Sequence, residues 1–256
     1  MAQVIFLENC TFLIPTKIDS EDRKINLTLV VDYLLKHFKT NIIIAEQDTE
    51  SKVKSFFKWG SKVKHIFVPS TNDFFHKTRL LNIMIKDATT DVVVSYDSDI
   101  ILPLNQYLDT FALLNSKQIH FAYPFNSRVY HIEKAQRGMF EKNLSLDDVG
   151  SHTTMKHPGV PPGGVLFMNK AEFAKCGYEN ENFKSWGAED IERTVRIEKF
   201  GYAVARMNGL IFHLEHDRTP HSTDANPHYK ENEVEFKKTV AMSKEELENY
   251  IKSWQF

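Results

Sequence analysis

Short apolar runs alternate with helix-like segments along residues 10–96, and this order constrains the fold more than any other feature. The apolar runs, which we expect to be strands, cover residues 10–15, 41–46, 63–68 and 92–96. Between them, residues 23–38, 53–59 and 77–87 carry apolar side chains at helical spacing. Continuous apolar strands separated by helices are typical of a parallel sheet covered by helices on its faces. The sequence therefore predicts an α/β fold.

The second half of the chain has a less regular pattern. Residues 130–157 are polar and poor in periodicity, so we expect a long irregular connection there. A turn rich in proline and glycine at residues 158–164 precedes an expected strand at 165–168, and a helix is expected at 188–200, before Gly201. Two further strands are expected at 202–206 and 210–214. The charged tail should end in a helix that begins at a capping box formed by Ser243 and Glu246.

Composition and charge exclude several classes of protein. Of the 256 residues 26% are charged, the formal net charge is -2, and Lys and Arg form no long run, so no nucleic-acid partner is expected. No apolar run approaches the ~20 residues that cross a bilayer, and no signal peptide is recognisable. We therefore expect a single-domain, cytoplasmic protein. Cys10 and Cys176 are too few for a disulfide framework and lack the CxxC spacing of zinc sites, so both should be buried.

Two carboxylates follow the fourth apolar run, at Asp97-Ser98-Asp99. If the chain stays extended here, Asp97 and Asp99 leave one face of the strand and Ser98 leaves the other. Two oxygen ligands can then converge on a divalent cation. Open α/β sheets bind ligands outside the carboxyl ends of their strands, which is where this motif falls. By itself an Asp-x-Asp motif is weak, because carboxylates at strand ends are common in solvated loops.

Two more segments strengthen the case for a site. Trp186-Gly187-Ala188-Glu189-Asp190 places two acids in a first helical turn, where the helix dipole favours negative charge. A capped helix with a core Trp would also account for that segment. The segment His213-Leu214-Glu215-His216-Asp217-Arg218 follows an apolar strand, and imidazole with carboxylate suits Mn²⁺, Fe²⁺ or Zn²⁺. On an extended chain His213 and His216 share no face, so both bind one ion only if the chain turns between them.

Six segments in the same order resemble the GT-A glycosyltransferases. They are Phe12 to Lys17 with Arg23, Phe75 to Asn82, Asp97 to Asp99, Pro162 to Val165, Trp186 to Asp190, and His213 to Arg218. The similar group comprises animal β-1,4-galactosyltransferases, the galactosyltransferase of proteoglycan linker synthesis and bacterial chondroitin-type polymerases. The resemblance implies a Rossmann-like, mostly parallel central sheet flanked by helices in one GT-A domain at 1–219. Its nucleotide-binding half would be about 1–100 and its acceptor half about 101–219, followed by a helical tail at 220–256.

The resemblance also implies roles for particular residues. Asp99, His216 and His213 would bind the metal, Mn²⁺ or Mg²⁺, and Asp190 would be the catalytic base. Trp186, Glu189, Gly163 and Gly164 would contact sugar. The nucleotide-binding residues would be Pro15, Thr16, Lys17, Arg23, Phe75, Lys77, Arg79, Asp97, Ser98 and Arg218, with Arg23, Lys77 and Arg79 near the diphosphate.

The implied reaction is transfer of a sugar from a UDP-sugar to a hydroxyl of a glycan or lipid-linked oligosaccharide. Gal, GalNAc, GlcNAc and GlcA are all candidate sugars, and the expected setting is bacterial surface polysaccharide synthesis. A divalent cation stabilises the departing diphosphate, while a carboxylate takes the proton of the acceptor hydroxyl. One base with direct attack predicts inversion at the anomeric carbon, by analogy with inverting glycosidases. The enzyme would work in the cytoplasm, at most in peripheral contact with the inner face of the membrane, and its oligomeric state stays open.

Two alternatives remain at this stage. An Asp-x-Asp phosphatase also places its motif after an apolar strand, although usually the first one and with Thr or Val two residues beyond the second Asp, where this chain has Ile101. A GT-A scaffold that binds carbohydrate or nucleotide without turnover is the other alternative. The chain also departs from the family pattern: Lys17 and Lys77 replace the Arg of several relatives, and Ala188 replaces a common Gly.

Overall fold

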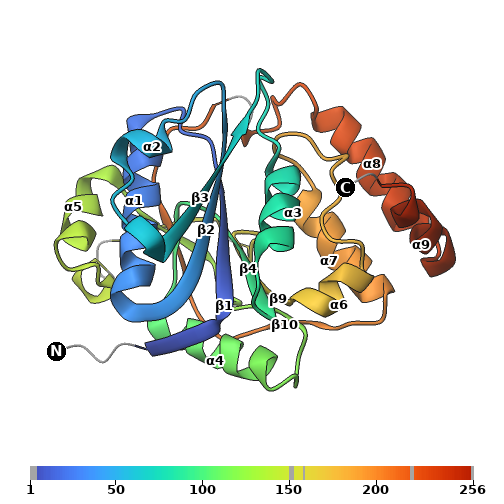
Figure 1. Cartoon of the computed structure of the whole chain (residues 1–256), viewed down its shortest axis with the longest axis horizontal. Helices are drawn as coiled ribbons and strands as arrows, with labels where there is room; N and C mark the ends of the chain where they lie inside the picture. The colour runs from blue at the N-terminus through green and yellow to red at the C-terminus, as the bar shows by residue number, and fades with distance from the viewer. Residues whose placement is uncertain (1–4, 150–152, 158, 220–221, 255–256) are drawn as a thin grey trace.

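The computed structural model describes residues 5–149, 153–157, 159–219 and 222–254, and its centre is a twisted sheet (Figure 1). In spatial order the seven strands are β10 (Val204–Arg206), β6 (Phe121–Tyr123), β9 (Val165–Asn169), β4 (Val92–Tyr96), β1 (Ile5–Thr16), β2 (Phe38–Asp48) and β3 (Val63–Pro69). β9 runs antiparallel to both of its neighbours, and the other neighbouring pairs are parallel. The expected mostly parallel α/β sheet is therefore confirmed.

Helices cover this sheet and extend beyond it (Figure 1). The α-helices are α1 (Glu21–His37), α2 (Val53–Phe56), α3 (Lys77–Asp87), α4 (Leu104–Asn115), α5 (Lys134–Asn143), α6 (Lys170–Lys175), α7 (Glu189–Lys199), α8 (Tyr229–Ala241) and α9 (Lys244–Lys252), with short 3₁₀ turns η1 (Gly60–Lys62) and η2 (Leu146–Asp148). Helix α3 buries Leu80, Leu81, Met84 and Ile85, the apolar face that its spacing predicts. The strand-helix alternation of the first half thus forms as expected.

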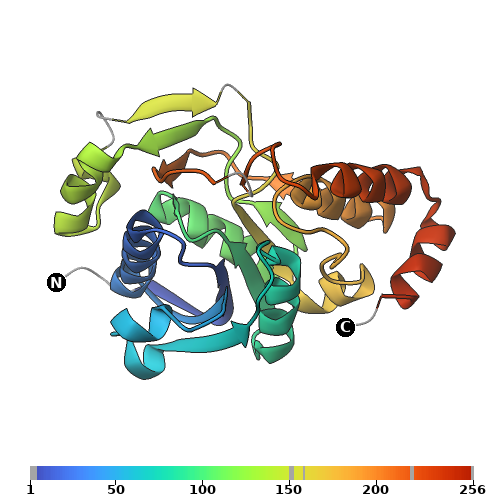
Figure 2. The same cartoon turned by 90° about the horizontal axis from the view of Figure 1, so that it is seen from above.

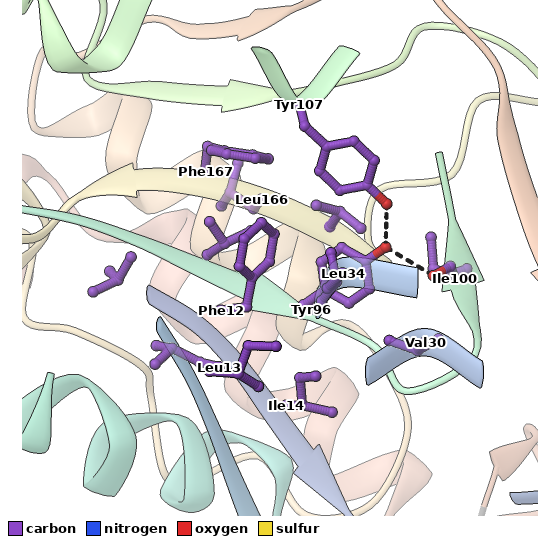
Figure 3. Close-up of a cluster of buried hydrophobic side chains, with 14 of the residues drawn as sticks. Phe12, Leu13, Ile14, Val30, Leu34, Tyr96, Ile100, Tyr107, Leu166 and Phe167 are labelled. Carbon is purple, nitrogen blue, oxygen red and sulfur yellow. Dashed lines mark hydrogen bonds between the residues drawn. The ribbon is translucent and has the colours of Figure 1, made fainter. Parts of the chain in front are cut away.

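The core fixes the end of β4, where the acidic motif begins. Phe12 of β1 packs edge-on against Tyr96 of β4 and Phe167 of β9 (Figure 3). The Tyr96 hydroxyl lies 2.5 Å from the hydroxyl of Tyr107 on α4 and donates a 2.8 Å hydrogen bond to the Ile100 carbonyl. Because these aromatic groups are fully buried, the segment between Tyr96 and Ile100 is anchored at both ends.

A second, smaller sheet brings distant segments to that same end. Its order is β5 (Ile100–Ile101), β11 (Ile211–Leu214), β7 (Val129–Ile132) and β8 (Thr154–His157). In the antiparallel pair of β5 and β11, His213 lies opposite Ile100, one residue after Asp99. Figure 2 shows β7 and β8 lying apart from the N-terminal strands of the large sheet. The small sheet thereby joins the acidic motif to the histidine segment.

The prediction of an irregular connection at residues 130–157 is wrong for the residues that the structure describes. This region contains β7, α5, η2 and β8, while residues 150–152 lie outside the described part. The polar sequence misleads because most side chains of this region are half-buried or exposed, so no clean apolar period develops. Helix α2 also ends earlier than expected, at Phe56 rather than residue 59.

The C-terminal part forms two helices rather than one. Ser243 caps α9, and the reciprocal bonds between Ser243 and Glu246 confirm the expected capping box. Helix α8, which the sequence did not reveal, packs alongside α7 (Figure 1). Among the described residues, no helix has both the length and the apolar character needed to cross a bilayer.

Candidate active site

A cavity of about 640 Å³ opens at the carboxyl ends of β1 and β4. It brings together every predicted site residue except one, whether the sequence assigned it to nucleotide, sugar, metal or catalysis. The lining residues among them are Pro15, Thr16, Lys17, Arg23, Phe75, Lys77, Asp97, Ser98, Asp99, Gly163, Gly164, Trp186, Glu189, Asp190, His213, His216 and Arg218. The exception is Arg79, whose side chain is exposed on α3 and lines no part of this cavity.

The Asp97-Ser98-Asp99 segment is a turn and not a continuation of β4. Ile100 donates a backbone hydrogen bond to the Asp97 carbonyl over 3.3 Å, and Asp97 donates one to the Gly164 carbonyl over 2.9 Å. The two carboxylates both line the cavity, as expected, but a turn and not strand alternation places them there. Asp97 pairs with Lys77 at 3.0 Å, whereas Asp99 faces the histidines. The two carboxylates thus serve different parts of the site.

Asp99, His213 and His216 form a cluster that could hold a metal ion. The Asp99 carboxylate oxygens lie 3.7 Å from His213 Nε2 and 3.1 Å from His216 Nε2. The chain leaves β11 after Leu214, so His213 and His216 reach the same carboxylate despite their spacing in sequence. His216 Nδ1 lies 2.8 Å from the Asp217 carbonyl, to which its N–H can donate, and in that tautomer the lone pair of Nε2, on the Asp99 side, is free to bind a metal ion. One carboxylate and two imidazoles suit Mn²⁺ better than Ca²⁺.

The ionisation of this cluster favours cation binding. Burial would raise the pKa of Asp99, but His213, His216 and Arg23 hold it well below its usual value. Burial lowers the pKa of His213 to about 4, an effect that Asp99 only partly opposes. At neutral pH the cluster therefore presents a carboxylate and a neutral His213 imidazole, the forms that bind metal ions.

Elsewhere in the same cavity, acidic and basic side chains surround Asp190. Arg193 lies 2.5 Å from Asp190 Oδ1, and Lys77 lies 3.4 Å from Asp190 Oδ2. Burial alone would raise the pKa of Asp190, but Lys77 and Arg193 lower it. The same Arg193, only 1% exposed, also pairs with Glu179 at 2.8 Å. Asp190 is therefore held ionised at the edge of the cavity.

Lys77 has a different setting from the one expected. Its Nζ lies 3.0 Å from Asp97, 3.4 Å from Asp190 and 3.8 Å from Glu189. Burial disfavours its charge, but these three carboxylates raise its pKa above the usual value. A diphosphate contact, as the resemblance implied, would have to compete with three carboxylates that Lys77 already neutralises.

Glu189 is a buried carboxyl with a raised pKa. Desolvation is the main cause, the neighbouring charge of Asp190 adds to it, and the pKa reaches about 7. Its Oε2 accepts a 3.0 Å hydrogen bond from the backbone of Gly187. Near neutral pH Glu189 can therefore both donate and accept hydrogen bonds.

Backbone geometry explains two sequence features. A Cβ on Gly163 would lie 1.9 Å from Asp190 Oδ2, so only glycine fits beside the carboxylate. Ala188 has φ 65°. This left-handed conformation favours glycine, so alanine adopts it here under strain.

The predicted nucleotide-binding residues in and after β1 line the cavity. Lys17 donates to the Asp73 carbonyl over 3.1 Å, and Arg23 pairs with Asp19 at 3.2 Å. Thr16 is buried, and its Oγ1 has no hydrogen-bond partner within the described residues. A buried hydroxyl without a partner at a cavity wall is a place for a ligand.

The sequence did not reveal several residues of the site. Asp19, Asp73, His131 and Ser185 line the cavity, and Arg193 lies behind Asp190. His131 is in register with His213 on neighbouring strands, with ring centroids 4.7 Å apart. For Arg193 a signal existed, because residues three apart on a helix are neighbours and a cation there faces Asp190. The position of His131 depends on strand pairing, which no local pattern indicates.

Comparison with known proteins supports the assignment of fold and class. Residues 152–219 match the family model described as N-terminal domain of galactosyltransferase. No match was found among curated protein sequences. The structure of GalNAc-T7 with UDP, GalNAc and Mn²⁺ is similar, with a TM-score of 0.61, 14% identity, and coverage of 90% of this chain and 47% of that chain.

Two Drosophila structures are also similar. A mutant β1,4-galactosyltransferase 7 with manganese, UDP-Gal and xylobiose has a TM-score of 0.55 and 14% identity, covering 94% of this chain and 81% of that one. The catalytic domain of the same enzyme with xylobiose gives a TM-score of 0.47 and 15% identity, with 79% and 65% coverage. The chain therefore spans about half the length of the GalNAc-T7 structure and 65% of this catalytic domain.

These findings define the fold. The architecture is the GT-A fold, and its family match covers the Trp186 turn and both histidines of the cluster. The resemblance to GT-A glycosyltransferases of the galactosyltransferase type, in the fold and in the match over residues 152–219, is confirmed.

Proposed function

We propose that this protein transfers a sugar from a UDP-sugar to a hydroxyl of a glycan acceptor, with Mn²⁺ or Mg²⁺ as cofactor. The observation that carries the proposal is the one cavity in which the Asp99, His213 and His216 cluster and the ionised Asp190 both take part. A leaving-group site and a base are the two requirements of this reaction. Similar folds have been solved with UDP, sugar and manganese, which supports the choice of donor and metal.

The described residues fit a divalent cation. Asp99, His213 and His216 would hold it, and when bound it would act as a Lewis acid on the diphosphate of the donor. The nucleoside would lie along Pro15, Thr16, Lys17 and Phe75, where the buried Thr16 hydroxyl lacks a partner within the described residues. Arg23, at 3.8 Å from Asp99, is the cation beside the metal cluster and therefore our candidate for a phosphate contact.

Asp190 would accept the proton of the acceptor hydroxyl. Its Oδ1 is held by Arg193, and its Oδ2 lies beside the Gly163 backbone on the cavity side. Glu189 would hold a sugar hydroxyl, and Trp186, 44% exposed at the cavity, would stack on a sugar ring. Because we assign Asp190 as the one base and no carboxylate as a nucleophile, we propose inversion at the anomeric carbon.

The decisive experiment replaces the base. Asp190→Asn should abolish transfer, with a loss of about 10²–10⁴-fold in kcat, because proton removal by a positioned base contributes that much. Metal-dependent binding of UDP should persist, since neither the proposed nucleoside contacts nor the Asp99, His213 and His216 cluster includes Asp190. Asp109→Asn, an exposed position on α4, is the matched control. An Asp190→Asn enzyme with undiminished transfer would remove Asp190 from the role of base.

The alternatives predict different outcomes. A scaffold would bind UDP with Mn²⁺ but release none from any UDP-sugar. A phosphatase would trap a phosphoryl group on Asp97; yet Asp97 follows the fourth strand and pairs with Lys77. A panel of UDP-Gal, UDP-GalNAc, UDP-GlcNAc and UDP-GlcA with oligosaccharide and lipid-linked acceptors would identify the sugar. It would also test the proposed setting in bacterial surface polysaccharide synthesis.

A further inference from the structure

The turn at residues 184–188, which carries Trp186 into the cavity, has an unusual backbone. Ser185 has φ 55°, Gly187 has φ 133° and Ala188 has φ 65°. Two of these three are not glycine, so this short turn stores strain directly before Glu189 and Asp190. Such a conformation persists only where its surroundings over-determine it. The groups that do so here come from a distant part of the chain.

Two buried asparagines of the C-terminal segment satisfy the backbone of this turn. Asn232 on α8 accepts from the Lys184 amide over 3.0 Å and donates to the Lys184 carbonyl over 2.8 Å. Asn226, just before α8, donates to the Trp186 carbonyl over 2.8 Å. Their exposed fractions are only 1% and 4%. In a sheet, the backbone of a neighbouring strand would bind these backbone groups. Here the two side-chain amides bind them instead.

Tyr229, the first residue of α8, supports the turn from behind. Its ring is stacked on the Trp186 indole, with centroids 6.1 Å apart and an interplanar angle of 17°. A Cβ on Gly187 would lie only 3.2 Å from the Tyr229 ring, so the two segments are in close contact. Trp186 lines the cavity and Tyr229 does not, so any effect of Tyr229 on a ligand passes through the indole.

We propose that Asn226, Tyr229 and Asn232 are positioning residues of the active site. They hold the strained turn so that the Trp186 indole meets an acceptor sugar ring and α7 starts with Asp190 directed at the cavity. This inference rests on the proposed function for the nature of the ligand. It makes the segment after residue 221, expected as a tail, a working part of the acceptor half.

The test uses the full chain and substitutions that preserve size where they can. Asn232→Asp and Asn226→Asp replace amide donors by carboxylates that face carbonyls, and Tyr229→Ala removes the stacked ring. Tyr229→Phe keeps the ring, and Val234→Ala changes an exposed position on α8, so both are matched controls. Three quantities are measured: hydrogen exchange of the peptide covering 183–189, kcat/KM for the acceptor, and the Kd of UDP with Mn²⁺.

The three substitutions should speed hydrogen exchange of the turn by about tenfold or more. They should also lower kcat/KM for the acceptor by about 10–100-fold, because a small misplacement of the groups that bind and activate the acceptor costs that much. The Kd of UDP should stay within about twofold, since its residues lie on other elements. Both controls should behave as the unsubstituted enzyme. If Asn232→Asp does not fold, Asn226→Asp and Tyr229→Ala carry the test.

Unchanged exchange in the folded variants would overturn the inference, as would losses of UDP binding as large as those of acceptor turnover. The second result would mean that α8 stabilises the whole domain rather than the turn. If the unsubstituted protein transfers no sugar to any acceptor, the proposed function fails. Exchange then decides the positioning claim alone: faster exchange supports it and unchanged exchange overturns it.

Discussion

At the scale of single residues, the ionisation of the acidic side chains in the site depends on a few cations that each contact more than one carboxylate. Asp190 keeps its charge because Arg193 and Lys77 contact it, while Glu189 beside it has a raised pKa because it is buried next to that charge. Two adjacent carboxyls thus acquire different protonation near neutral pH. Enzymes that need one base and one hydrogen-bonding carboxyl use this kind of separation.

Gly163→Ala should inactivate the enzyme with little loss of stability. The new methyl would collide with Asp190 Oδ2, at 1.9 Å, and would push the carboxylate away from Lys77. We expect kcat to fall by about 10²-fold, as for comparable misplacements, with a change in unfolding free energy of about 1 kcal/mol. Steady-state kinetics and urea unfolding measure the two effects. The control is Gly138→Ala on α5, where a Cβ meets nothing within 4 Å; equal activity of both variants would contradict the prediction.

Glu189 should make stability depend on pH. Its folded pKa of about 7 exceeds the ordinary value of 4.5, so the folded state binds this proton more tightly than the unfolded state does. The associated stability is present below about pH 4.5 and is lost as pH rises through 7. Glu189→Gln should therefore gain stability over the unsubstituted protein between pH 5 and 8, on the order of 1–3 kcal/mol.

The measurement is thermal or urea unfolding at several pH values, with a chelator and without UDP. Glu198→Gln, at an exposed position of the same helix, should show no such pH-dependent gain. A constant difference between Glu189→Gln and the unsubstituted protein across this range would show that Glu189 does not titrate there.

At the scale of elements, three strands and helix α4 place the acidic motif. β4 ends at Tyr96, the short β5 pairs with β11, and the Tyr96 and Tyr107 hydroxyls fix the turn between them. Tyr107 also accepts a hydrogen bond from the Leu102 amide over 3.1 Å. The metal cluster is therefore built on elements that belong to the core.

Tyr107→Phe should destabilise the fold and loosen the metal cluster. Removing the hydroxyl leaves the buried Leu102 amide without this partner, which costs about 1–3 kcal/mol. Urea unfolding measures the loss, and Mn²⁺ titration measures the accompanying weakening of binding. Tyr202→Phe, which removes a more exposed bond to Glu172, is the comparison and should cost less. If Tyr107→Phe costs no more than Tyr202→Phe, the tyrosine pair does not anchor the turn.

At the scale of the whole molecule, the cavity joins segments from residue 15 to residue 222. The large sheet supplies the side that we propose for the nucleotide. β11 and the residues just after it supply the two histidines, and the Trp186 turn lies between α7 and the contacts from α8. The division into a domain at 1–219 and a tail at 220–256 stays a prediction. The contacts of Asn226 and Asn232 with the Trp186 turn nevertheless link the two parts closely.

Binding of metal and nucleotide should stabilise the molecule together. A ligand at 100 times its Kd adds about 2.7 kcal/mol to unfolding free energy, so Mn²⁺ with UDP should raise Tm by several degrees. The rise with both should exceed the sum of the separate rises, because a cation held by Asp99, His213 and His216 would also stabilise the diphosphate. Differential scanning fluorimetry with Mn²⁺, UDP and both measures this. Asp99→Ala should lose the joint effect; an equal rise in Asp99→Ala would place the metal elsewhere.

The sequence by itself determined the strand-helix order of the first half, the burial of its apolar faces and the residue types that the site needs. Those features depend on local periodicity and on side-chain chemistry, which a linear pattern records. Only the tertiary structure decided that Asp97 and Asp99 part at a turn, that Lys77 sits among three carboxylates, and that Arg79 stays outside the cavity. It also revealed Arg193, His131 and the asparagines that hold the Trp186 turn. These contacts join residues far apart in sequence, or depend on the exact direction of a side chain, and strand pairing and helix packing fix both.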